Sequence, residues 1–369
     1  EVERIVLAEI RNLIDNGPTK EELKRVKASY FAGFIKGLER IGGFGGVSDI
    51  LASNETYFGD ASYYKTVLKF VEEATVEDLT NTMQKWLNRG RHTLVCKPFP
   101  VFSVTESSVD RSNIPALGPQ KSASFPDLER SKLSNGLNIV LAKRKGVSTV
   151  VMNLMFDAGY KTDHLSSAGT AALAMNLLDE GTKELNSLEI NEKLELLGAN
   201  IYTFSDQDNS NVYLNTLKPS LTPSLDLFAE IVLNPSFPEK EFERLKTEQI
   251  NNIKNEKSNP IAMALRSMNK YLYGEDHPYS NPYTGTGYEE TVAQLTRQDA
   301  LNFYDTWIRP NNATLVVTGD VEMNELKSAL EKSLGKWKKK DVPKIEFKDP
   351  KIDAKNTLYL IDRPESQQS

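Results

Sequence analysis

The sequence contains an internal repeat. Segments within residues 8–95 recur about 220 residues further on, in the same order and with nearly constant spacing. The matched pairs are Ala8–Ile10 with Ala229–Ile231, Glu22–Lys27 with Glu241–Lys246, and Thr75, Asp78, Trp86 and Thr93–Val95 with Thr296, Asp299, Trp307 and Thr314–Val316. This spacing is far longer than the period of a solenoid. The sequence therefore predicts two homologous domains in one polypeptide.

Length and composition agree with two domains. A chain of 369 residues exceeds the size of one typical core, and its 39% hydrophobic and 26% charged residues are typical of globular proteins. The single cysteine, Cys96, excludes an internal disulfide and a cysteine-based zinc cage. A net charge of −6 without a basic cluster argues against a nucleic-acid surface.

No apolar run approaches the length of a transmembrane helix. The first residue, Glu1, already lies in an amphipathic pattern, so a signal peptide would lie outside this sequence. The sequence specifies no compartment; the periplasm or cell envelope would suit a bacterial protein.

The first copy of the repeat has a helical pattern. Apolar residues on one face predict an amphipathic helix over residues 2–16. Thr19 and Glu22 have the spacing of a capping box, which predicts the start of a long helix. A strand is expected at Thr93–Cys96. Residues 99–127 then hold four prolines among serines and threonines, which is the composition of a linker.

The second copy alternates strands and helices. It is expected to open with a hairpin over Ser131–Ala142, because Asn135-Gly136 is a turn signal. Runs of apolar residues predict strands at Thr149–Phe156 and Thr314–Thr318. A lysine-rich connection then leads to one more predicted strand at Thr357–Ile361.

Four segments carry a specific combination of residues: Phe156–Tyr160, Ala168–Ala171, Leu177–Thr182 and Arg309–Asp320. Together they resemble the insulinase and pitrilysin family of zinc peptidases, and the similarity spans nearly the whole chain. The resemblance implies an α+β fold with duplicated α/β domains, each an antiparallel-rich sheet packed with helices. It also implies two halves that close around a chamber that admits peptides.

Members of this family hold zinc with H-x-x-E-H on a helix. Residues i, i+3 and i+4 share one helical face, so two imidazoles bind the metal while the glutamate activates its water. Between Gly169-Thr170 and Gly181-Thr182, these three positions are occupied by Ala172, Met175 and Asn176. The resemblance therefore predicts the helix without its zinc chemistry.

The third ligand in the family is a glutamate on a later helix. Counted from Phe242-Glu243-Arg244, its position aligns with Asn252, with Glu248 and Glu256 one turn to either side. Because zinc needs three protein ligands, these carboxylates alone do not make a zinc site. For Asn176 and Asn252, hydrogen bonds to each other or to the backbone are expected rather than a shared hard cation.

The remaining candidate ligands have simpler interpretations. His92 and Cys96 would share one face of a strand, where burial is favoured over metal binding. His164 and His277 are predicted to lie in polar loops and to have no chemical role.

The sequence thus predicts a non-catalytic section of an insulinase-like zinc metallopeptidase. Residues 1–98 would be the last domain of the first half, 99–127 a linker, 128–340 the first domain of the second, inactive half, and 341–369 a linker with the start of the next domain. No cofactor is expected in this chain; zinc is expected in the catalytic half of the full protein. An arginine–tyrosine pair that grips the substrate belongs, in the family, to the domain that would begin near Thr357.

The expected partners are a peptide or small protein substrate and the missing half, either in the same polypeptide or in a partner subunit. No nucleic acid or membrane span is expected, and open sheet edges could pair in a homodimer. The alternative function is a pseudopeptidase scaffold, as in the family's core subunits of respiratory complexes. A free-standing peptide-binding module is a third option, disfavoured by those open edges.

Overall fold

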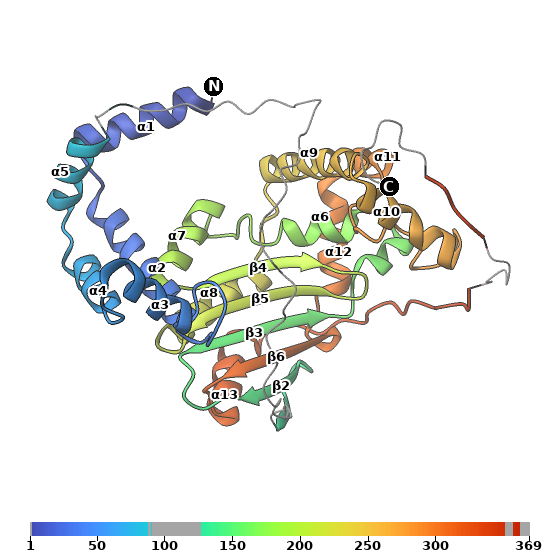
Figure 1. Ribbon diagram of the computed structural model, residues 1–369. Coiled ribbons are helices and arrows are strands. Elements are labelled where there is room, and N and C mark those ends of the chain that lie inside the picture. Colours follow the sequence, from blue (N-terminus) through green and yellow to red (C-terminus); the bar gives the residue numbers. More distant parts are fainter. Residues whose placement is uncertain (1, 88–89, 91–126, 351–356, 362–369) are drawn as a thin grey trace, which may run out of the picture. The chain divides into compact units, whose positions relative to one another are not determined.

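The computed structural model describes residues 2–87, 90, 127–350 and 357–361 (Figure 1). By their contacts these residues form two compact units. One consists of the described residues of Glu1–Leu23 and Val67–Pro126, the other of those of Lys24–Thr66 and Asp127–Ser369. None of the helices in the described ranges is both long and apolar enough to cross a membrane.

The α-helices are α1 (Val2–Asn16), α2 (Lys20–Leu38), α3 (Val47–Phe58), α4 (Tyr64–Glu73), α5 (Val76–Trp86), α6 (Thr170–Asn176), α7 (Ser187–Leu197), α8 (Leu221–Leu233), α9 (Glu239–Glu256), α10 (Pro260–Tyr273), α11 (Glu289–Gln294), α12 (Arg297–Trp307) and α13 (Met323–Leu334). The strands are β1 (Leu128–Lys132), β2 (Asn138–Lys143), β3 (Thr149–Phe156), β4 (Asn200–Ser205), β5 (Ser210–Leu217) and β6 (Ala313–Gly319). Short 3-10 helices are η1 (Tyr160–Leu165), η2 (Lys218–Ser220) and η3 (Pro310–Asn312).

The repeat found in the sequence reappears in the helices. Thr75 begins α5 with a capping box, in which its backbone N–H donates to Asp78 Oδ2 at 2.9 Å. Thr296 begins α12 in the same way, with Asp299 Oδ2 at 2.7 Å. Matching residues thus form matching helix starts in both copies. The expected strand Thr93–Cys96 and nearly all of the expected linker lie outside the described residues.

The long helix α2 begins as predicted, because Glu22 N–H donates to Thr19 Oγ1 at 3.1 Å and Thr19 N–H donates to Glu22 Oε2 at 2.7 Å. From Lys24 onward its residues group with the second copy, whereas the sequence places them with residues 1–98. The reason is close packing: Ala32 is 4% exposed, and a Cβ on Gly198 would lie 2.5 Å from the Ala32 Cβ. The assignment of residues 1–98 to another half stays a prediction.

One six-stranded sheet dominates the larger unit, with strand order β1-β2-β6-β3-β5-β4. The pair β2–β6 is parallel, and every other pair is antiparallel. The fold is therefore mixed α and β with a mostly antiparallel sheet, as predicted. The strands β3 and β6 were also predicted within one residue of their ends, and β1 and β2 form the expected hairpin.

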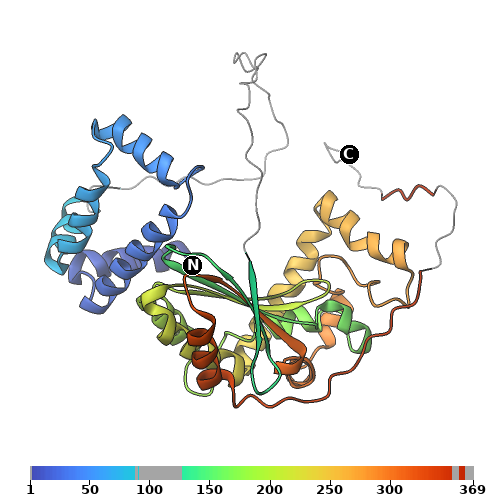
Figure 2. The same cartoon turned by 90° about the horizontal axis from the view of Figure 1, so that it is seen from below.

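The core lies between one face of this sheet and a layer of helices. Along β3 the fully buried residues alternate with half-buried ones, so Met152, Leu154 and Phe156 point to the core. They join buried side chains of α6, α8, α12 and α13. In Figure 2, α8 (yellow-green) and α13 (red) lie on the same side of the sheet. Each large side chain buried there contributes about 1.5–3 kcal/mol.

The predicted strand at Thr357–Ile361 is wrong. The structure assigns no strand to these described residues, and Leu358 and Leu360 are almost fully exposed. A strand is defined by hydrogen bonds to a neighbouring strand, and an apolar alternation alone does not supply them. Tyr359 instead stacks on Tyr271 of α10, with ring centroids 4.0 Å apart.

The hairpin turn between β1 and β2 also caps a distant helix. The buried amide of Asn135 donates from Nδ2 to the carbonyl of Leu334, the last residue of α13, at 2.8 Å and to Trp337 O at 3.3 Å. Its Oδ1 accepts the N–H of Leu137 at 3.2 Å. The turn and the end of α13 therefore stabilise one another.

Replacing this amide should be costly. Asn135→Ala is expected to lower the free energy of unfolding by about 2–3 kcal/mol, because two buried carbonyls lose their donor. Asn135→Asp keeps the size but directs a carboxylate at those carbonyls, so it should destabilise at least as much. Urea unfolding of the two variants and the parent chain measures both effects. Equal stability of Asn135→Asp and the parent chain would contradict this role for the amide.

Candidate functional site

Helix α6 occupies the position predicted for the helix without zinc ligands. It follows β3, the turn at Asp157–Gly159 and the 3-10 helix η1. Ala172 is half-buried, Met175 is 1% exposed and Asn176 is exposed. Met175 therefore packs in the core, out of reach of a metal, and Ala172 and Asn176 carry neither an imidazole nor a carboxylate.

The start of α6 is fixed by a buried carboxylate. Asp163, at 3% exposure, accepts the Gly169 N–H at 2.7 Å on Oδ2 and the Ala171 N–H at 2.9 Å on Oδ1. Burial raises the pKa of Asp163 to about 7, and the backbone N–H donors partly oppose this shift. A carboxylate at this position satisfies amides that have no partner within the helix and interacts favourably with its dipole.

Helix α9 packs against the start of α6. Gln249 on α9 donates from Nε2 to Gly169 O at 3.0 Å and to Thr286 O at 2.9 Å. Gly169 has a φ of 97°, and a Cβ there would lie 2.8 Å from that Nε2 atom. The glycine is therefore required both by its backbone conformation and by the close approach of α9.

The fourth aligned position, Asn252, is exposed on α9. Neither Asn252 nor Asn176 has a side-chain hydrogen bond to the described part of the chain, so the expected mutual or backbone hydrogen bond is not formed. Within the described residues no three His, Cys, Asp or Glu side chains come together in a group that could hold a metal.

The two carboxylates that flank Asn252 are engaged by arginines. Glu248 lies 3.3 Å from Arg244, whose guanidinium also contacts Glu241 at 2.6 Å and Glu180 at 2.5 Å. The hydrogen bonds from Glu241 and Glu180 raise the pKa of Arg244 further above its usual range. An arginine cation, held by three carboxylates, thus ties α9 to the turn that follows α6.

Glu256, on the other side of Asn252, lies 2.5 Å from Arg266 in a largely buried ion pair. Thr286 Oγ1 also donates to it at 2.8 Å. Sequence reasoning missed both arginines. The i, i+4 spacing of Arg244 and Glu248 could have indicated the first pair, whereas the second depends on how α9 and α10 pack.

The histidines lie in different surroundings. His164 is exposed on η1, and His92 and Cys96 lie outside the described residues. His277 lies in the loop after α10, as predicted, but its ring is buried and stacks on Tyr273, with centroids 5.0 Å apart. Its Nδ1 accepts the Tyr279 N–H at 3.0 Å. Aromatic packing and a local turn therefore account for His277.

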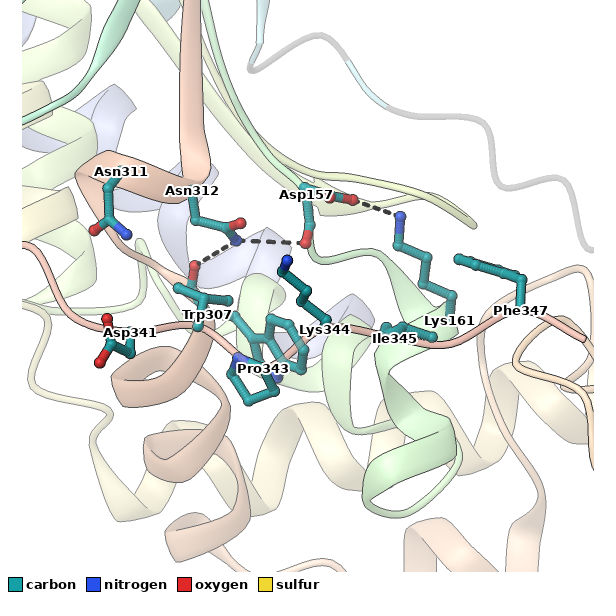
Figure 3. A pocket seen from close by; sticks show the side chains of 11 residues that line it. Asp157, Lys161, Trp307, Asn311, Asn312, Asp341, Pro343, Lys344, Ile345 and Phe347 are labelled. Carbon is teal, nitrogen blue, oxygen red and sulfur yellow. Dashed lines mark hydrogen bonds and ion pairs between the residues drawn. The ribbon is translucent and has the colours of Figure 1, made fainter.

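A hollow of about 660 Å³ lies away from α6 and α9, beneath the segment Asp341–Phe347 (Figure 3). Its best-buried charge, Lys161, is 2.5 Å from Asp157 and 3.5 Å from Asp208. The described residues that line it include no histidine, cysteine or serine. The positive charge of Lys161 is compensated by the two aspartates.

Comparison with known proteins agrees with this geometry. The family model described as insulinase, peptidase family M16, matches residues 138–286, and the model described as the peptidase M16 inactive domain matches residues 294–369. The chain belongs to the insulinase family of peptidases, M16. The first match covers strands β2 to β5, α6 and α9, and the second covers α12, β6 and α13.

Curated M16 relatives are longer than this chain. The rat (Rattus norvegicus) mitochondrial-processing peptidase subunit beta is 24% identical over 220 residues, which are 59% of this chain and 44% of that protein. The zinc protease PqqE of Helicobacter pylori is 27% identical over 244 residues, 64% of this chain and 54% of PqqE. The chain therefore spans about half the length of these relatives.

Two solved structures share the M16 fold. A peptidase M16 inactive domain from Pseudomonas fluorescens has a TM-score of 0.56 and 22% identity, and covers 61% of this chain and 54% of its own. A protease from Helicobacter pylori has a TM-score of 0.57 and 24% identity, and covers 62% and 55%. At this level of identity the likeness concerns the fold.

The raised pKa of Asp163 predicts a pH-dependent stability. Between its ordinary pKa of 3.8 and the folded value of about 7, the folded protein holds the proton more tightly than the unfolded chain. The free energy of unfolding should therefore fall as the pH rises through this window, by up to about 1.4 kcal/mol per pH unit.

Asp163→Asn should remove this contribution and flatten the profile between pH 4 and 7. The free energy of unfolding is measured at several pH values for Asp163→Asn and for the parent chain. The difference between the two profiles separates the contribution of Asp163 from that of Asp179, which is present in both proteins. The pKa of Asp179 is also raised, to about 6, by burial. Parallel pH profiles of the variant and the parent chain would contradict the raised pKa of Asp163.

The alignment of the zinc-ligand positions can be tested by restoring ligands. We expect Ala172→His with Asn176→His and Asn252→Glu to create a zinc site with a Kd of about 1 µM or lower, since α6 and α9 are in contact. Met175 stays in place because it packs in the core. Isothermal titration with zinc measures the gain. The matched control with only the two histidines should bind at least about tenfold more weakly. A triple variant no better than this control would refute the position assigned to Asn252.

Proposed function

We propose that this chain is the non-catalytic section of an M16 zinc metallopeptidase. In this proposal it forms part of the wall of a peptide-binding chamber, and a zinc site in the other half of the full protein hydrolyses the peptide. Residues 128–340 would be the first domain of the inactive half, and residues 1–98 the last domain of the preceding half.

The observation that carries the proposal is the chemistry of α6 and α9. The M16 architecture is present, yet the four aligned positions hold Ala172, Met175, Asn176 and Asn252. The flanking carboxylates, Glu248 and Glu256, are paired with arginines. None of these groups can supply the imidazole pair that holds a catalytic zinc.

The relatives support an enzyme rather than a scaffold as the whole protein. PqqE is named a zinc protease, and this chain covers 54% of it. Helices α1 and α5 expose Ile5, Val6 and Trp86, apolar side chains that the other half would cover in this proposal. A substrate of peptide or small-protein size fits a chamber of this kind.

The proposal predicts that the 369-residue chain alone has no zinc-dependent peptidase activity. A quenched fluorescent peptide library should remain uncut by this chain with added zinc. The full protein encoded by the same gene should cut it, and a chelator should abolish that activity. Cleavage by the isolated chain would refute the proposal. An inactive full protein, without H-x-x-E-H, would indicate the scaffold function instead.

A further inference from the structure

Helices α7 and α8 border a groove of about 500 Å³ on the larger unit. Its floor is made of leucines: Leu196 and Leu197 from α7, Leu227 from α8, and Leu185 from the preceding turn. Leu196 is 42% exposed, and Leu185, Leu197 and Leu227 also pack against the core. The floor is thus a fixed apolar surface, of a size within the usual range of ligand pockets.

The rim of the groove is acidic. Asp226 and Glu230 lie one turn apart on the same face of α8, and Glu184 lines the groove from the turn before α7. Among the described residues that line the groove, Lys193 is the one basic residue. The mouth therefore carries an excess of negative charge over a leucine floor.

The acids of the rim are not neutralised by the described part of the protein. Neither Glu184 nor Asp226 has an ion pair or a side-chain hydrogen bond there. Glu230 accepts one hydrogen bond, from Asn234 Nδ2 to Oε2 at 2.6 Å, while its Oε1 is buried without a partner. A buried carboxylate oxygen without a donor is costly, and positive charge brought to the mouth of the groove would lower that cost.

We propose that this groove binds a short amphipathic helix of a partner protein, with lysine or arginine beside leucine-sized residues. Apolar side chains at positions i, i+3, i+4 and i+7 of such a helix would cover the leucine floor. Its basic side chains would then reach Glu184, Asp226 and Glu230. Two helices that border an apolar groove are a common receptor for a third. The site shares no residue with α6 or α9, so it is independent of the proposed chamber function.

A designed peptide tests this inference on the full 369-residue chain. A labelled peptide of about 14 residues, with leucines on one helical face and lysines elsewhere, is compared with a peptide in which glutamate replaces every lysine. Fluorescence anisotropy should show the lysine peptide binding at least about tenfold more tightly, and its affinity should fall with added salt.

Two charge-reversal variants locate the contact. Glu184→Lys with Asp226→Lys should weaken binding of the lysine peptide at least about tenfold. The matched control, Glu243→Lys with Asp276→Lys, makes the same charge change at exposed acids outside the groove and should bind like the parent chain. Leu196→Ser should also weaken binding. Circular dichroism confirms that each variant is folded. Equal binding by the two double variants, or by the two peptides, would overturn the proposal.

Discussion

The arrangement of α6 and α9 depends on the buried carboxylate of Asp163. It accepts backbone N–H groups at the start of α6, and the carbonyl of Gly169 at the same point accepts the amide of Gln249 from α9. Both contacts are buried, so losing either partner would leave a polar group unsatisfied in the core. These contacts explain how the two helices keep their relative position without zinc ligands at Ala172, Asn176 and Asn252.

The side chains of α6 and α9 are explained by ordinary packing and charge balance. Met175, which the sequence analysis aligns with the catalytic glutamate, adds apolar area to the core. Arg244 supplies the positive charge that balances Glu180, Glu241 and Glu248. Each replacement satisfies the local requirement for burial or for charge, and none provides an activated water. The fold and the zinc chemistry are thus separable.

Much of the fold was readable from local patterns. The capping box at Thr19, the turn at Asn135-Gly136 and the alternation along Thr149–Phe156 each depend on neighbouring residues alone. The strand predicted at Thr357–Ile361 failed because an apolar alternation cannot show whether a partner strand exists. The setting of His277 was missed for a similar reason: its neighbour Phe347 is distant in sequence.

By itself, the sequence determined the repeat and the family, and it predicted that Ala172, Met175, Asn176 and Asn252 replace the zinc-site residues. These properties depend on which side chains are present and on their spacing. Only the tertiary structure decided that Glu248 and Glu256 are held by arginines, that Asn135 caps α13, and that leucines of α7 and α8 share one acidic groove. Such contacts join residues from different elements. Their energies depend on burial and distance, which a linear pattern does not contain.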